Sequence, residues 1–206
     1  MPLCTDEIFN SAAERIGIGR GDSITEDNKT TLSAVIGDYA VMMNDKLGSP
    51  PIQRIISDAD KFTGDRLRAL DMYRQYRYTW LKILDVEPGV GVKCRDLLTG
   101  EEGFLMETSL SRSYGGCGVR DMTLCAGIGS LPNGTWMALG AISSAGFDNP
   151  ELVLKIVLSH LGIPYDMPIR LSFPDQARFA AETIRRIHTI GRYSNIKYGG
   201  LADLND

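Results

Sequence analysis

The spacing of apolar residues changes twice along the chain, and this constrains the fold more than any single motif. From the N-terminus to about residue 76, apolar side chains recur every three or four residues, as on one face of a helix. From Tyr78 to about residue 145 they alternate with polar residues or glycine, as in half-buried strands. From Asn149 onward the helical spacing returns. This order predicts an α+β protein with a β region between two helical regions.

Capping residues mark the ends of the predicted helices. Thr5 precedes two acidic residues and is a favourable N-cap for the first helix. Asn149 before a proline predicts the start of a later helix, and Gly162 has the residue type that ends helices in a left-handed conformation. The glycine-rich segment 17–21 superficially resembles a phosphate-binding loop. It follows a helix and lacks the Gly-Lys-Ser/Thr ending, so it is interpreted as a linker.

The β region holds about five short strands within about 65 residues. Val90, Val92 and Cys94 alternate with small or polar residues, and Asn133-Gly134 accepts the backbone angles that hairpin turns require. Because so many short strands cannot hide their edges in an open sheet, we predict a small antiparallel β-barrel-like sheet flanked by helices. The chain is expected to form one compact unit with a helical region at 1–77, a barrel-like region at 78–146 and a helical region at 147–206.

Composition and charge limit the possible functions. The 206 residues are 43% apolar and 23% charged, which is ordinary for a globular protein. The net charge of −4 argues against a dedicated nucleic-acid-binding protein, because such proteins are usually basic. No apolar run approaches the ~18 residues of a membrane span, and acidic residues stand where a secretion signal would be basic. We therefore expect a cytoplasmic protein that makes no membrane contact.

The cysteines and histidines predict neither a metal site nor a disulfide, and we expect no cofactor. Cys94 and Cys125 are interpreted as small apolar core residues. Cys117, flanked by glycines, is the most nucleophile-like residue, but it needs a base, and both histidines, His160 and His188, fall on predicted helices. No Cys-x-x-Cys pair or zinc-like spacing occurs among the four cysteines, Cys4, Cys94, Cys117 and Cys125.

The basic and aromatic segment Arg74–Lys82 is the strongest candidate for a binding surface. Arginine contacts phosphate and aromatic rings stack on bases, and the same residue types dominate the hot spots of protein interfaces. Alternatively, Tyr76 and Trp80 are packing anchors between the helical and β regions, with the arginines partly exposed. Arginines of the last helix extend the same candidate patch. The predicted binding residues are Arg74, Arg77, Tyr78, Trp80, Lys82, Arg178 and Arg185.

One stretch has a familiar pattern. Residues 83–102 read ILDVEPGVGVKCRDLLTGEE, followed by ETSLSR at 107–112 and LCAGI at 124–128. Over 83–128 the chain resembles an uncharacterised bacterial β domain that often occurs beside a cysteine-rich SEC-C zinc motif. That motif is absent here, so the resemblance implies neither zinc binding nor an enzymatic activity. From the residues themselves, Arg95-Asp96 is expected to form a salt-bridging pair at a strand end.

These observations predict a non-enzymatic interaction or regulatory module that binds a protein partner. Two alternatives stay open. One is a nucleic-acid-associated protein that uses the basic and aromatic segment, and the other is a small enzyme with Cys117 as its nucleophile. A steep salt dependence of binding would indicate the first alternative, and a reactive thiolate the second.

Overall fold

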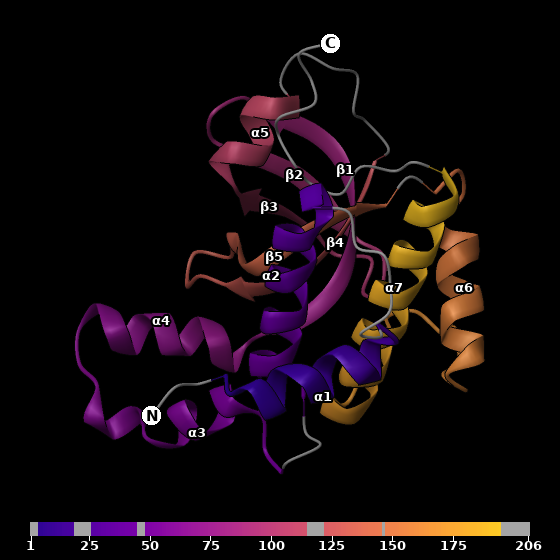
Figure 1. Ribbon diagram of the computed structural model, residues 1–206. Coiled ribbons are helices and arrows are strands. Elements are labelled where there is room, and N and C mark those ends of the chain that lie inside the picture. The colour runs from indigo at the N-terminus through magenta and orange to yellow at the C-terminus, as the bar shows by residue number, and fades with distance from the viewer. Residues whose placement is uncertain (1–3, 19–25, 45–47, 115–121, 146, 195–206) are drawn as a thin grey trace.

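The structure, a computed structural model, describes residues 4–18, 26–44, 48–114, 122–145 and 147–194. As predicted, helices precede and follow a β region (Figure 1). The helices that precede it are α1 (Asp6–Ile16), α2 (Glu26–Met42), α3 (Pro51–Ser57), the 3-10 helix η1 (Ala59–Lys61) and α4 (Asp65–Arg74). The β region comprises β1 (Arg77–Glu87), β2 (Gly91–Asp96), β3 (Glu102–Met106), α5 (Thr108–Tyr114), β4 (Thr123–Ser130) and β5 (Trp136–Ala145). Helices α6 (Pro150–His160) and α7 (Phe173–Ser194) follow.

The five strands form a closed ring in the order β1-β2-β3-β5-β4. Four neighbouring pairs are antiparallel, whereas β3 and β5 are parallel, with Leu105 beside Trp136 and Met106 beside Met137. The predicted α+β class with about five strands is confirmed, but the wholly antiparallel sheet is wrong at this pair. The reason is topological, because strand direction cannot alternate all the way round a ring with an odd number of strands.

The predicted helix caps form as expected. The Thr5 hydroxyl accepts a hydrogen bond from the Ile8 backbone N–H (3.4 Å), and the Asn149 side-chain oxygen accepts one from the Leu152 N–H (3.0 Å). Gly162 has the left-handed φ of 71° that the sequence indicates. These local signals fix where α1 and α6 begin and where the chain leaves α6.

Helix α5 follows β3 directly and interrupts the series of strands. Its first turn begins at Glu107, whose carboxylate accepts a hydrogen bond from the Ser109 backbone N–H (3.0 Å). The Ser111 hydroxyl then accepts a hydrogen bond from the Gly89 N–H (3.1 Å) and so ties α5 to the turn between β1 and β2. The helix therefore covers the β1–β2 end of the ring (Figure 1).

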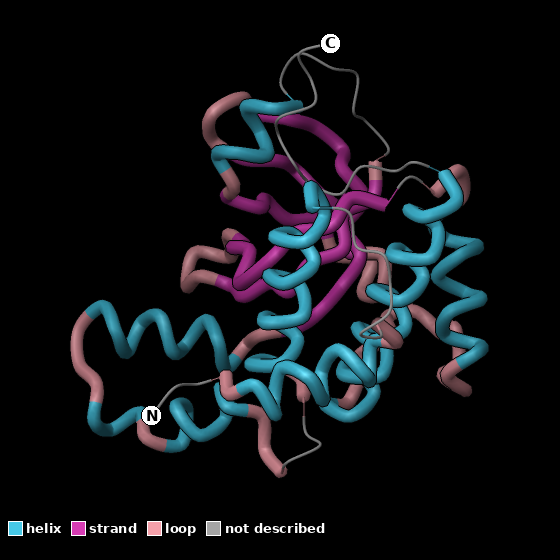
Figure 2. Tube along the Cα trace, viewed as in Figure 1, coloured by secondary structure: helices cyan, strands magenta, loops and turns pink. Residues whose placement is uncertain are grey.

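Two hydrophobic cores share β1. Alternate residues such as Leu81 and Ile83 contribute to a core that contains barrel residues from all five strands. Tyr78 and Trp80 contribute to a second core, which joins the ring to α1, α2, α6 and α7. Strand β1 is thus buried on both faces over much of its length. Figure 2 shows helices on several sides of the strands, with α6 beyond α7 on one side. None of the described helices is long and apolar enough to cross a membrane.

Candidate functional site

The predicted binding residues Tyr78 and Trp80 lie in the core. Trp80 is fully buried, its indole N–H donates to the Thr183 hydroxyl (3.1 Å), and its ring stacks on Phe147 with the centroids 5.1 Å apart. Tyr78 is 7% exposed and meets the Phe179 ring edge-on at 6.3 Å. Trp80 therefore anchors β1 to α7, which confirms the packing interpretation of this residue.

The charged members of the predicted set are distributed over several elements. Lys82 is half-buried on β1, and Arg185 donates to two backbone carbonyls at the end of α1. Helices α4 and α7 lie apart in Figure 1, so the structure does not gather the set into one patch. Its role in binding stays a prediction. Three of the arginines pair with an acid three residues earlier on the same helix, namely Arg74 with Asp71, Arg178 with Asp175 and Arg185 with Glu182.

Arg77, the remaining arginine of the set, lies at one end of the ring beside buried Asp96. The Arg77 Nε donates to Asp96 Oδ2 (3.1 Å), and the guanidinium lies 5.2 Å from the centroid of the Trp136 ring. Asp96 Oδ1 accepts hydrogen bonds from the Thr79 hydroxyl (2.7 Å) and the Leu98 backbone N–H (2.8 Å). Both carboxylate oxygens are thus hydrogen-bonded within the chain, and removing Arg77 would leave an uncompensated buried charge at this end of the ring.

The predicted pairing of Arg95 with Asp96 is wrong. Arg95 instead reaches Glu102 on β3, with Nη2 2.6 Å from Oε1. The reason is the alternation of side chains along a strand, which directs two consecutive residues to opposite faces. Asp96 therefore lies inside with Arg77, whereas Arg95 lies on the outer face of the ring.

That outer face carries an open groove of about 380 Å³ across β1, β2 and β3. Its walls combine charged side chains from all three strands with one aromatic ring. Cross-strand pairing places Lys93 directly between Asp85 and Phe104, so these three residues form one row across the strands. The lining residues are Asp85, Glu87, Lys93, Glu102, Gly103 and Phe104.

Charge and shape in this groove have clear local causes. Hydrogen bonds from Arg95 and then Lys93 lower the pKa of Glu102, so its carboxylate stays ionised. The Lys93 ammonium lies 3.2 Å from Glu102 Oε2. A Cβ at Gly91 would come within 2.3 Å of the Leu105 backbone oxygen and within 2.7 Å of the Phe104 ring. A glycine at position 91 therefore lets the aromatic ring lie close to the sheet.

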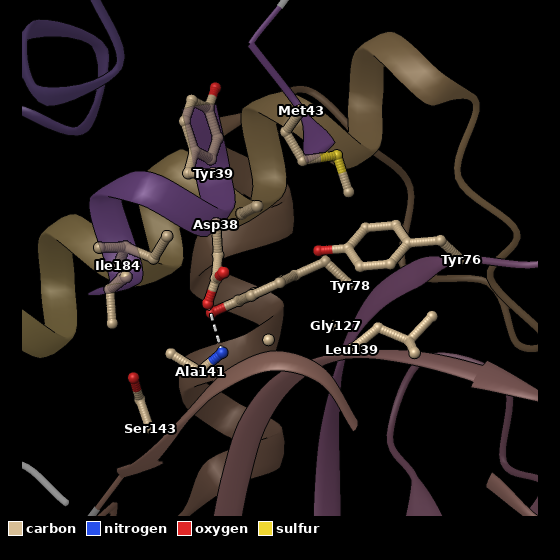
Figure 3. Close-up of a pocket in the computed structure, with 13 residues that line it drawn as sticks. Asp38, Tyr39, Met43, Tyr76, Tyr78, Gly127, Leu139, Ala141, Ser143 and Ile184 are labelled. Atoms are coloured by element: carbon tan, nitrogen blue, oxygen red, sulfur yellow. Dashed lines mark hydrogen bonds between the residues drawn. The ribbon is translucent and has the colours of Figure 1, made fainter. Parts of the chain in front are cut away.

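A second cavity lies between α2 and the strands, and it holds an acid that the sequence analysis did not identify. The Asp38 carboxylate accepts a hydrogen bond from the Ala141 backbone N–H of β5. Figure 3 shows the hydroxyl ends of Tyr76 and Tyr78 turned toward the same cavity. Gly140, with φ of 135°, permits this approach, because a Cβ there would come within 2.7 Å of the Asp38 carboxylate.

The environment of Asp38 keeps its neighbours protonated. Burial raises the pKa of Asp38, and the hydrogen bond from Ala141 partly opposes this shift. Burial, and then the Asp38 charge, raise the pKa of Tyr76, while burial raises that of Tyr78. A carboxyl with a raised pKa in a cavity often marks a functional site. The cavity has a volume of only about 20 Å³, however, which is room for one water molecule and not for a substrate.

The sequence does contain a signal for Asp38. It is an acid within the apolar run VIGDYAVMM, at positions 35–43, most of which lies in α2. An isolated acid in such a run either breaks the buried face or finds a buried hydrogen-bond donor. The groove has a weaker signal, because its acids and its aromatic ring come from three strands that only the folded ring brings together.

Two of the described cysteines, Cys94 and Cys125, are core residues as the sequence predicts. Cys94 and Cys125 are fully buried. Burial raises the pKa of Cys94 to about 12 and that of Cys125 well above its ordinary value, so neither is a ready thiolate. Cys117 lies outside the described residues, as does the side chain of His188. His160 is exposed near the end of α6. Within the described residues, no three His, Cys, Asp or Glu side chains gather as metal ligands.

Comparisons with known proteins identify no relative. No protein family matches the chain, and no curated protein or solved structure is significantly similar to it. The chain is therefore defined by its architecture, an α+β protein with a closed ring of five strands, a charged groove on the outside and helices around it.

Proposed function

We propose that the chain is a non-enzymatic protein-binding module and that its ligand-binding face is the groove over β1, β2 and β3. The observation that carries this proposal is the combination of an aromatic side chain, Phe104, with ionised carboxylates in one open groove. The ring also has the five strands of a small Greek-key barrel of the OB type. Barrels of that type bind extended ligands on the face of strands 2 and 3 and beside the β1–β2 loop. This analogy concerns the fold and supports the location of the site, not the identity of the ligand.

The charge of the groove favours a protein ligand with basic residues. Three carboxylates, on Asp85, Glu87 and Glu102, line it together with the Lys93 ammonium, and the Arg95 guanidinium lies beside Glu102 on the same face. Because Glu102 already pairs with these two cations, we expect Glu87 to attract a segment with Arg or Lys next to an apolar or aromatic residue and to repel a polyanion. The cations beside Glu102 keep it ionised, so it acts through its charge and is a poor proton donor at neutral pH. The buried Cys94 and Cys125 thiols are compatible with work in a reducing cytoplasm.

Fluorescence anisotropy with three labelled probes tests this proposal. The probes are a peptide of alternating Arg and Trp, a matched peptide of alternating Glu and Trp, and a single-stranded oligonucleotide. We expect the Arg-Trp peptide alone to bind. Glu87→Lys in the groove should weaken that binding about fivefold, because an attractive charge becomes repulsive. Asp65→Lys on α4, whose side chain is 96% exposed, is the control with the same change of charge and should bind like the wild type.

Three outcomes would contradict the proposal. Equal binding of the two peptides would show that the carboxylates do not select the ligand. Unchanged affinity in Glu87→Lys would place the binding site elsewhere. Tight oligonucleotide binding that weakens steeply between about 50 and 200 mM salt would favour a nucleic-acid-associated protein instead.

A further inference from the structure

The outer face of α6 carries apolar and charged side chains with matching spacing. Leu152 and Ile156 are 53% and 48% exposed, although both are large aliphatic residues. They are four residues apart, which places them one above the other on the helix. Glu151 and Lys155, also exposed, have the same spacing. The opposite face of α6 is buried against the rest of the protein through Leu154, Val157 and Leu158.

This pattern is complementary to itself. A two-fold axis perpendicular to α6 would place a second copy of the helix antiparallel to the first. The side of the helix that carries Glu151 and Lys155 would then lie next to the same side of the second copy. Leu152 of one copy would then meet Ile156 of the other, and Glu151 would meet Lys155, each twice. The two-fold axis that best pairs Leu152 with Ile156 and the one that best pairs Glu151 with Lys155 lie only about 1.5 Å apart along the helix, which is the rise of one residue. Side chains of this length absorb such an offset.

We infer that the protein self-associates as a two-fold dimer through the outer faces of α6 from two copies. Helix α6 lies at the right-hand edge of the protein in Figure 1, beyond α7, so a second copy can approach it from that side. Lys155 is held in place by its contact with the Tyr165 ring, whose centroid lies 4.8 Å from the ammonium. This contact orients the cation and reduces the entropy lost on pairing. The face is distinct from the groove on the strands and does not depend on the function proposed for it.

The length of α6 sets the expected strength of the dimer. Eleven residues span about 16 Å, so the interface is small and the dimer weak. Sedimentation equilibrium of the full chain from about 10 to 500 µM should give a dissociation constant of about 10–100 µM. The double variant Leu152→Asp with Ile156→Asp should remain monomeric over this range. Both positions are exposed, so circular dichroism should show an unchanged fold.

Charge reversal provides the specific test. Glu151→Lys alone would place lysines opposite each other, and Lys155→Glu alone would place glutamates opposite each other, so each should weaken the dimer about tenfold. The double variant Glu151→Lys with Lys155→Glu should restore most of the association, because it exchanges the partners of the same pairs and loses only the contact of Lys155 with Tyr165. Arg68→Glu on α4, at a side chain that is 84% exposed, is the control and should dimerise normally.

The inference is overturned if the wild type stays monomeric at about 500 µM or if the aspartate double variant still dimerises. It is also overturned if the charge exchange fails to restore association. The Glu87→Lys groove variant should dimerise normally, and the aspartate double variant should still bind the Arg-Trp peptide. Failure of self-association and failure of the proposed peptide binding are therefore separate results.

Discussion

Replacing Trp80 by alanine should be among the most destabilising single changes in this protein. Its side chain is fully buried between β1 and the helices, and it contacts the Phe147 and Phe179 rings with centroids 5.1 and 6.0 Å away. Removing a buried Trp side chain typically costs about 3–5 kcal/mol, through lost burial and the cavity left behind. The Thr183 hydroxyl would also lose its donor, which adds roughly 1 kcal/mol.

Urea unfolding followed by circular dichroism measures this cost directly. Trp80→Ala should lower the free energy of unfolding by about 4–6 kcal/mol with little change in the urea dependence. Trp80→Phe keeps most of the ring packing and loses the hydrogen bond, so its loss should be roughly 1–2 kcal/mol. Arg68→Ala, at an exposed position on α4, should change stability by no more than about 0.5 kcal/mol. A Trp80→Ala variant within about 1 kcal/mol of the wild type would refute the view that this residue anchors the ring to the helices.

Three further variants or reagents test other parts of the structure. Burial raises the pKa of Asp38 in the folded chain, so its contribution to stability is greatest below the unfolded pKa and is lost as the pH rises through the folded one. Asp38→Asn keeps an acceptor for the Ala141 N–H. The melting temperature of this variant should therefore rise relative to that of the wild type as the pH increases from about 4 to 7. A difference in melting temperature that is the same at every pH would contradict this. Arg77→Ala leaves the buried Asp96 charge without its ion-pair partner and should cost about 3–5 kcal/mol in urea unfolding, whereas an exposed pair would cost less than about 1 kcal/mol. A thiol reagent should label Cys94 and Cys125 only as the chain unfolds, as read by mass spectrometry of the peptides, and rapid labelling in native buffer would show that they are accessible.

Much of the local structure was predictable because its causes are local. The change of hydrophobic spacing near Tyr78 and again near Asn149 matches the boundaries of the β region. The caps at Thr5 and Asn149 also follow from residues a few positions away. Trp80 was predictable as an anchor, because a large aromatic residue at a change of secondary structure usually packs across the junction.

The candidate binding site was less predictable. The basic and aromatic segment stands out in the sequence, yet the structure pairs Arg74 with Asp71 and Arg77 with Asp96. The groove depends instead on residues of three strands, and the segment that contains Cys117 lies outside the described residues. A row of side chains across strands leaves no continuous motif, because neighbouring strands contribute one residue each.

The spacing of apolar residues was sufficient to indicate the α+β class and the order of helical and β regions, because burial on one face imposes a period that is visible along the chain. The parallel placement of β3 beside β5, the Arg77–Asp96 pair and the contact between Asp38 and Ala141 became visible only in the folded protein. These last two contacts join residues 19 and 103 positions apart. No local period encodes such partners, because the way the ring closes and the helices pack determines which distant residues meet.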